Sequence, residues 1–180
     1  LVHRRGLALA PALHGGPQER GRRPGSEPVA LIAGFGVAAE LAATELAQRA
    51  AHTGALVSRL RAGLERLPGV TLHGDPEQHL GTTVNVGFDG CDGQLLLINL
   101  DLAGFAVSTG AACSSGSLEP SPVLLGLGLA PEAARSALRI SLGKDNRSED
   151  VDELLAALPE LLAQVRGASV DAAGWREVNV

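Results

Sequence analysis

The chain has 180 residues and a formal net charge of −5, and 45% of its residues are hydrophobic but only 2% aromatic. So few aromatic side chains argue against a protein that stacks nucleic-acid bases, and the negative charge argues against one that follows a phosphate backbone. Two cysteines are too few for a disulfide framework. We see neither a secretory signal nor an apolar run of the roughly 18 residues that a membrane span needs. We therefore expect a cytoplasmic protein that binds neither nucleic acid nor membrane.

The first 28 residues have little periodic pattern and are rich in Gly, Arg and Pro, which is typical of loops. From Val29 to about Leu67, apolar residues recur at three- and four-residue steps among many alanines. This pattern predicts one long helix, or two that are separated near Gly34–Gly36 or His52–Gly54, and Pro68 ends it. A helix of this length can bridge two domains.

Beyond residue 68, short predicted strands and helices interleave, which indicates a small α/β or α+β layer. Strands are predicted where apolar and polar residues alternate, and helices where apolar residues recur behind a capping residue. The predicted strands are Val70–His73, Thr82–Phe88, Phe105–Val107 and Ala137–Leu142, and the predicted helices are Gln94–Leu102 behind Asp92, Ser121–Leu129, a turn from Pro131 to Arg135, and Ser148 to about Val165.

Between the predicted strand Phe105–Val107 and Pro120 lies a loop of small, uncharged residues around a single cysteine, Cys113. Gly and Ser favour turns over helix and strand, so a cysteine on this loop can be approached closely. A structural cysteine more often lies within an apolar periodic segment. The pattern by itself leaves two interpretations open: a reactive thiol, or a Gly/Ser linker that happens to hold a cysteine.

Three blocks of this sequence, in the order His14–Ser26, Ala106–Leu124 and Leu138–Gly143, share one resemblance. They resemble, in turn, the Gly-Gly-x-x-Glu-Arg-Gly-x-Arg-x-Gly-Thr block, the active-site loop and the Arg-Phe-Ser-Leu-Gly block of the cysteine desulfurases. These are pyridoxal-phosphate enzymes of fold type I in the class V aminotransferase family. The resemblance spans about residues 1–164 and implies the later part of an α/β enzyme of this fold. The implied parts are a remnant of the large cofactor domain (1–28), a linking helix (29–68), a small C-terminal domain with the cysteine loop (69–166) and a tail (167–180).

The resemblance implies roles for three residues. Cys113 matches the cysteine that attacks the sulfur of cofactor-bound L-cysteine, leaving L-alanine and an enzyme persulfide. Arg139 matches the arginine that binds the substrate carboxylate through two hydrogen bonds, although without the match we would favour a surface or salt-bridged arginine. Ser26 matches a threonine that reaches the cofactor phosphate of the neighbouring subunit, but it could equally be a helix N-cap.

Other reactive side chains are assigned no chemistry. Cys91 lies where the family pattern has no cysteine, and we interpret it as an incidental turn residue. The five histidines show no ligand spacing with either cysteine, so we expect no metal site.

Pyridoxal phosphate requires a lysine that holds it as a Schiff base. Lys144 is the only lysine in the chain, and its place beside the Leu138–Gly143 block makes it a poor substitute for the family's lysine, which lies upstream of the block at His14–Ser26. The chain also lacks Met, which indicates either a processed or unusual start or the later part of a longer protein.

We therefore expect part of a cysteine desulfurase that is inactive alone. The complete enzyme is expected to be a homodimer that acts on L-cysteine and passes sulfur to an acceptor protein, such as an iron–sulfur scaffold or a tRNA-thiolation enzyme. Two alternatives stay open: a cofactor-free remnant that carries a persulfide or binds a partner, and another class V member such as a selenocysteine lyase.

Overall fold

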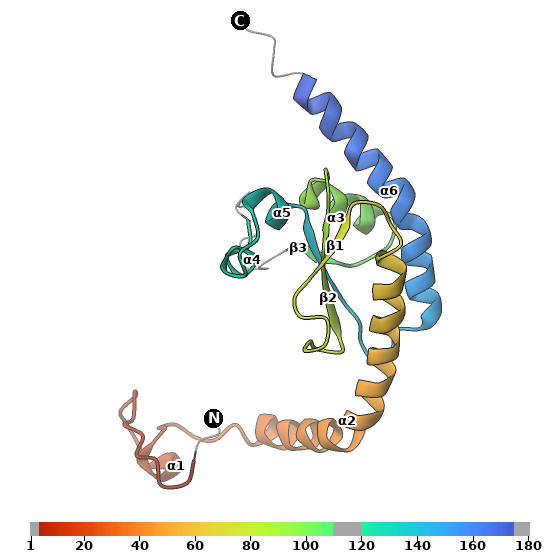
Figure 1. The fold of residues 1–180 in the computed structure, drawn as a ribbon. Helices are drawn as coiled ribbons and strands as arrows, with labels where there is room; N and C mark the ends of the chain where they lie inside the picture. Colours follow the sequence, from red (N-terminus) through yellow and green to blue (C-terminus); the bar gives the residue numbers. More distant parts are fainter. Residues whose placement is uncertain (1–3, 110–119, 175–180) are drawn as a thin grey trace, which may run out of the picture. The chain divides into compact units, whose positions relative to one another are not determined.

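A computed structural model describes residues 4–109 and 120–174, with side chains described as far as residue 167 (Figure 1). The chain divides into two compact units, Leu1–Leu46 and Ala47–Val180. Helix α2 (Val29–Leu64) has residues in both units. Cys113 lies outside the described residues, so its predicted role is not tested by the structure.

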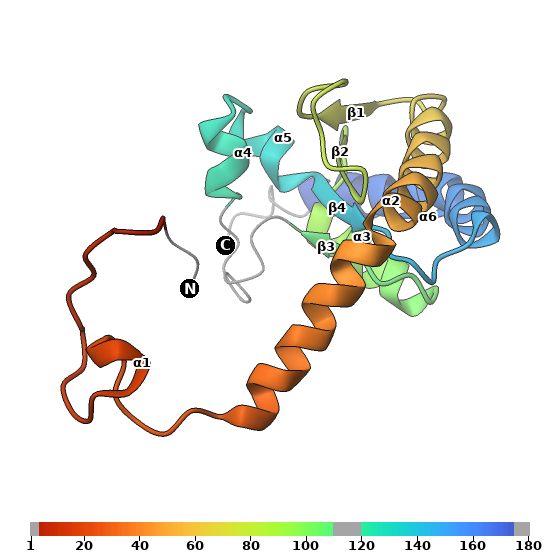
Figure 2. The same cartoon turned by 90° about the horizontal axis from the view of Figure 1, so that it is seen from below.

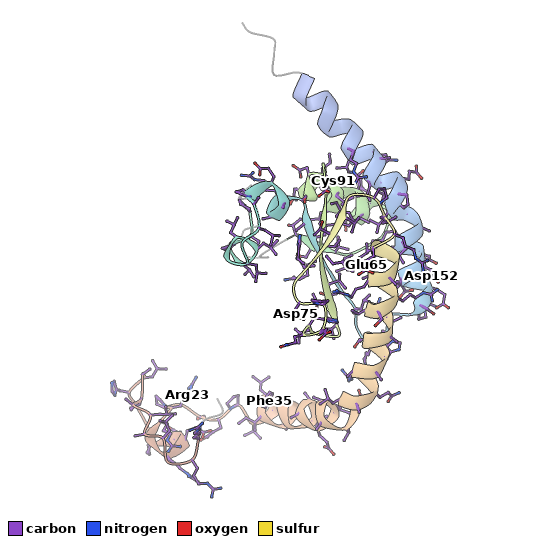
Figure 3. The ribbon with its side chains drawn as sticks, viewed as in Figure 1. Arg23, Phe35, Glu65, Asp75, Cys91 and Asp152 are labelled. Carbon is purple, nitrogen blue, oxygen red and sulfur yellow. The ribbon has the colours of Figure 1, made fainter. Side chains whose placement is uncertain are left out.

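The first unit holds the short helix α1 (Gln18–Gly21) and the first part of α2. Glu19 and Arg20 have left-handed backbone angles, with φ of 50° and 59°, which are uncommon for residues other than glycine. No described residue before Thr53 is buried. The first part of α2 therefore exposes apolar side chains, including Leu31 (74% exposed) and Phe35 (76% exposed), and Phe35 is labelled in Figure 3.

The expectation that no apolar run reaches the length of a membrane span was wrong for α2. Within Val29–Leu64, an 18-residue window has a mean hydropathy of 1.6, and none of it is buried in the structure. Length and composition alone do not separate a membrane span from a helix that another part of a protein covers. The finding is therefore weak support for a membrane helix.

The second unit is built on a four-stranded antiparallel sheet with the strand order β1-β2-β4-β3 (Figure 1). The strands are β1 (Val70–His73), β2 (Thr83–Phe88), β3 (Ser108–Thr109) and β4 (Ala137–Ser141). The helices are the second part of α2, α3 (Gly93–Leu102), α4 (Pro122–Gly126), α5 (Pro131–Arg135) and α6 (Ser148–Gly174).

One face of the sheet packs against α2, α3 and α6, and the main apolar core lies between them. The cross-strand pairs Val84–Ile140 and Val86–Leu138 point into this core, because alternate residues of a strand share a face. The second part of α2, within the second unit, lies beside α6 in Figures 1 and 2. Arg59 of α2 joins Asp152 of α6 through two hydrogen bonds of 2.6 and 2.7 Å, and Figure 3 labels Asp152 on that helix.

A smaller apolar cluster, Leu124, Ala134 and Ala137, ties α4 and α5 to the start of β4. It fixes the part of the chain that follows the segment 110–119. The long helix and the strands Val70–His73, Thr83–Phe88 and Ala137–Ser141 confirm the predictions from periodicity. The carboxylate of Asp92 accepts hydrogen bonds from the amides of Gln94 and Leu95 and caps α3, as predicted.

Three predicted boundaries were wrong. The helix expected over Ser121–Leu129 ends at Gly126, and the other two errors concern β3 and α6. A strand was expected at Phe105–Val107, but the amide of Phe105 donates to the carbonyl of Leu100, and that of Gly104 (φ 92°) donates to Asp101. These two bonds close the end of α3, so the strand pairing begins only at Ser108. The last helix was expected to end near Val165 but continues to Gly174. Gly167, inside this helix, does not have the positive φ of a glycine that ends a helix.

Candidate functional site

Arg139 lies in the middle of β4, on the sheet face opposite the main core. Its neighbours Leu138 and Ile140 are buried, and the Arg139 side chain is exposed, as the alternating sequence predicted. Among the described residues, no hydrogen bond or ion pair joins the Arg139 guanidinium to another side chain. The structure therefore does not favour a salt-bridged arginine, while the exposed side chain is consistent both with the other alternative, a surface arginine, and with a residue that binds a ligand.

The strands on either side of β4 place polar residues directly beside Arg139. Asn85 of β2 and Ser108 of β3 are its partners in the two antiparallel ladders. His73 of β1 is in turn the partner of Asn85. A polar row, His73–Asn85–Arg139–Ser108, thus crosses all four strands.

His73 and Asn85 are joined by a hydrogen bond of 2.7 Å between Nδ1 of the ring and Oδ1 of the amide. Both side chains are half-buried. The imidazole ring lies against Gly87, where a Cβ atom would come within 2.9 Å of the His73 Cε1. The absence of a side chain at Gly87 therefore makes room for the ring.

The sequence had indicated neither His73 nor Asn85 as a functional residue. Both were recognisable only as polar positions of predicted strands. Their place beside Arg139 depends on the order and register of the strands, and nothing in the local sequence pattern specifies these.

The cysteine loop begins at the strand that flanks Arg139. Ser108, which lies opposite Arg139, and Thr109 form β3, and the segment that holds Cys113 follows at once. The structure thus brings together Arg139 and the start of this loop, while Cys113 itself is not described.

Ser26 lies in the first unit, exposed, and three residues before α2 begins at Val29. The alternative interpretation of Ser26 as the N-cap was therefore wrong, because the amide of Ile32 donates to the carbonyl of Pro28, which marks Pro28 as the boundary residue. The Ser26 hydroxyl has no partner among the described residues.

Lys144 is exposed in the turn between β4 and α6. A lysine that forms a Schiff base is activated in a desolvated pocket or beside other cations. The described residues therefore do not by themselves fit pyridoxal phosphate, because they offer a hydroxyl and a guanidinium but no enclosed lysine.

Cys91 follows the turn after β2, but its side chain is only 8% exposed and belongs to the main core. Figure 3 labels it close to the start of α3. Burial raises the pKa of its thiol, and the nearby Arg166 opposes this increase only in part. Arg166 donates to the carbonyls of Pro68 (3.1 Å) and Asp89 (3.0 Å), which fixes the chain around Cys91. Cys91 is thus a core residue rather than an incidental turn residue.

Within residues 4–109 and 120–174, no group of three or more His, Cys, Asp or Glu side chains could hold a metal ion. A hollow lies beside the C-terminal end of β4, lined by Ser141, Asn146, the acidic Asp150 and Glu153 of α6, and mostly apolar residues of α2, α6 and the segment before β3. It does not include Arg139. The polar row is therefore the best-supported site in the described part of the second unit.

Residues 14–154 match the family model for class-V aminotransferases. The chain belongs to the class-V aminotransferase family. This match confirms the resemblance that the three sequence blocks indicated, and the family uses pyridoxal phosphate.

Class-V relatives with curated names include cysteine desulfurases. The chain is 45% identical over 169 residues to cysteine desulfurase IscS of Methanosarcina thermophila. The aligned region covers 94% of this chain and 42% of that protein. It is 40% identical over 170 residues to cysteine desulfurase NifS of Azotobacter vinelandii, with 94% and 42% covered. The chain thus spans less than half the length of these relatives.

Solved structures of the family share the fold. A NifS-like protein from Rickettsia africae superposes with a TM-score of 0.75 at 30% identity, over 86% of this chain and 40% of that chain. A second NifS-like protein gives a TM-score of 0.77 at 36% identity, over 89% of this chain and 40% of that one. The predicted α/β fold, with a small sheet packed by helices, is confirmed.

Proposed function

We propose that this class-V chain is part of a cysteine desulfurase, in which Arg139 binds the carboxylate of L-cysteine and Cys113 takes its sulfur. The observation that carries the proposal is the pairing of Ser108 with Arg139, because it attaches the cysteine loop to the strand beside the arginine. The relatives named cysteine desulfurase support the same activity.

The segment between β3 and Cys113 is short enough to keep the Cys113 thiol near a substrate that Arg139 binds. Cys113 follows Thr109, the last residue of β3, by four residues. Four extended residues span at most about 14 Å, so the Cα atom of Cys113 is tethered within that distance of the strand that flanks Arg139. A loop rich in Gly and Ser has the backbone freedom to approach a bound substrate and then a sulfur acceptor.

In the proposed reaction, the Cβ–Sγ bond of L-cysteine breaks and a sulfur–sulfur bond to Cys113 forms. The thiol hydrogen lost by Cys113 balances the hydrogen that the β-carbon gains, so the products are L-alanine and a persulfide on Cys113. A thiol with a pKa of about 8.5 is a few per cent thiolate at neutral pH and is already a strong nucleophile. The guanidinium of Arg139 matches a carboxylate with two parallel hydrogen bonds, which orients the amino acid.

Pyridoxal phosphate, when bound, supplies an electron sink for the amino-acid substrate. The lysine that holds it is proposed to come from a part of the enzyme outside these 180 residues, so this chain alone is proposed to be inactive. Ser26 is proposed to bind the cofactor phosphate of the neighbouring subunit in a homodimer. The persulfide sulfur is proposed to pass to an acceptor protein in the cytoplasm.

The test is a sulfide and alanine assay with L-cysteine on the complete enzyme that contains this chain. Replacement of Cys113 by Ser is expected to abolish sulfide release, because the serine hydroxyl cannot form a persulfide. Cys91→Ser is the matched control and is expected to retain activity in the folded protein, because Cys91 belongs to the core.

Two results would contradict the proposal. Full sulfide release from the Cys113→Ser enzyme would favour another class V activity, such as that of a selenocysteine lyase. Sulfide release from the isolated 180-residue chain would show that the cofactor lysine is not supplied from elsewhere.

A further inference from the structure

We propose that Asn85 is a second residue of the carboxylate site, whose side-chain amide donates to the carboxylate that Arg139 binds, while His73 holds that amide in position. The inference rests on the proposed function of Arg139. It adds one ligand-binding residue and one positioning residue to the site.

The hydrogen bond between His73 and Asn85 orients the amide. The Oδ1 atom of Asn85 can only accept, so the His73 Nδ1–H must be the donor over their 2.7 Å contact. The Asn85 Nδ2 group then keeps two N–H donors. No other described residue accepts a hydrogen bond from it.

Arg139 has the same need for an acceptor. Directly opposed residues of an antiparallel pair have Cβ atoms about 5 Å apart, so the guanidinium and the amide of Asn85 start from neighbouring positions. A guanidinium has five N–H donors and no acceptor. On the other side of Arg139, the Ser108 hydroxyl donates to the carbonyl of Thr109 at 3.2 Å. The polar row thus presents the amide N–H groups of Asn85 on β2 and the guanidinium N–H groups of Arg139 on β4. No described side chain accepts a hydrogen bond from either group.

The charge of this sheet face favours an anion. The chain has 20 acidic residues against 15 lysines and arginines, yet the strand positions that share the face with Arg139 include no acidic residue. These positions are Thr71, His73, Thr83, Asn85, Gly87, Ser108, Ala137 and Ser141.

Packing fixes the amide before any ligand arrives. His73 and Asn85 are half-buried, and the His73 ring rests on the backbone of Gly87. A donor that is already oriented loses little freedom on binding, which favours affinity. A small carboxylate, such as that of an α-amino acid, has two oxygens and can accept hydrogen bonds from both donor groups.

The experiment is an NMR titration of the ¹⁵N-labelled 180-residue chain with L-alanine, and ethanolamine is the matched probe without a carboxylate. We expect the Asn85 side-chain amide signals to shift with L-alanine but not with ethanolamine. Asn85→Ala is expected to weaken L-alanine binding about tenfold, the lower limit for a hydrogen bond to a charged group. Thr83→Ala, on the same face and strand, is expected to bind as the unaltered chain does.

The positioning role of His73 has its own variants. His73→Ala is expected to weaken binding, and His73→Gln to restore it, because a glutamine amide can again donate to Asn85 Oδ1. Equal losses in both variants, with unchanged backbone spectra, would overturn the role of His73.

Two outcomes separate this inference from the proposed function. If Arg139→Ala abolishes binding while Asn85→Ala binds normally, the role of Asn85 is overturned and that of Arg139 stands. If Arg139→Ala binds L-alanine as well as the unaltered chain, the carboxylate role of Arg139 fails, and the role of Asn85 fails with it.

Discussion

Ser108 of β3 lies directly opposite Arg139 of β4 in an antiparallel ladder. The sequence separates these residues by 31 positions, but the sheet makes them neighbours. Because the segment that holds Cys113 follows β3, two residues after Ser108, the sheet connects the proposed carboxylate-binding residue to the proposed nucleophile through two short strands. If the proposed role is correct, substitutions at Arg139 are expected to change substrate binding.

Arg139→Lys is expected to lower kcat/KM for L-cysteine in the complete enzyme by about 10- to 100-fold, mainly through KM. Lysine keeps the positive charge but loses the planar pair of donors, and a hydrogen bond to a charged group contributes about 1.5–3 kcal/mol. Steady-state kinetics checks this. Arg135→Lys, an exposed arginine on α5, is the control, and an equal loss in that variant would contradict a specific role for Arg139.

Gly63 of α2 lies directly against the side chain of Leu155 of α6. A Cβ atom at position 63 would lie 2.7 Å from Leu155 Cδ2 and 3.0 Å from its Cγ. We expect Gly63→Ala to lower the free energy of unfolding by about 1–3 kcal/mol, the usual cost of overpacking. In a Leu155→Ala background, the same change is expected to raise it by up to about 1 kcal/mol, because alanine favours helix over glycine. Urea unfolding measures both, and equal effects in the two backgrounds would refute the steric explanation.

Local sequence patterns predicted the elements whose stability depends on neighbouring residues in the chain. Alternation predicted the strand at Ala137–Ser141 together with its exposed Arg139, and the side chain of Asp92 predicted the start of α3. Both signals act over a few residues, so the sequence alone is enough to read them.

The parts that the sequence did not predict depend on distant contacts or on competition between local ones. Phe105 has a strand-like sequence, but its amide closes the end of α3, which moves the strand to Ser108. Cys91 follows a turn, yet its side chain completes a core made by distant helices. Asn85 acquires its place beside Arg139 only through strand order and register.

The Cys91 thiol is expected to react slowly with thiol reagents in the folded chain. In a Cys113→Ser variant it is the only thiol, and its reaction is expected to be at least about tenfold faster in urea, where it becomes exposed.

Burial also makes the stability of the fold depend on alkaline pH. Since burial raises the pKa of the Cys91 thiol, the neutral thiol stabilises the fold below the ordinary thiol pKa of about 8.5, and this stability is lost as pH rises through the raised pKa. Unfolding midpoints that match those of Cys113→Ser/Cys91→Ala at every alkaline pH would contradict this.

Lys144 is expected to form no lasting Schiff base when the 180-residue chain is mixed with pyridoxal phosphate. The lysine is exposed in the turn after β4 and does not lie in the kind of enclosed, desolvated pocket that activates a Schiff-base lysine. After gel filtration, the chain is expected to lack the visible absorbance band of a protein-bound aldehyde adduct, and Lys144→Ala is expected to give the same spectrum. A stable band that disappears in Lys144→Ala would instead identify Lys144 as a cofactor lysine. The proposed need for a lysine from outside these 180 residues would then be wrong.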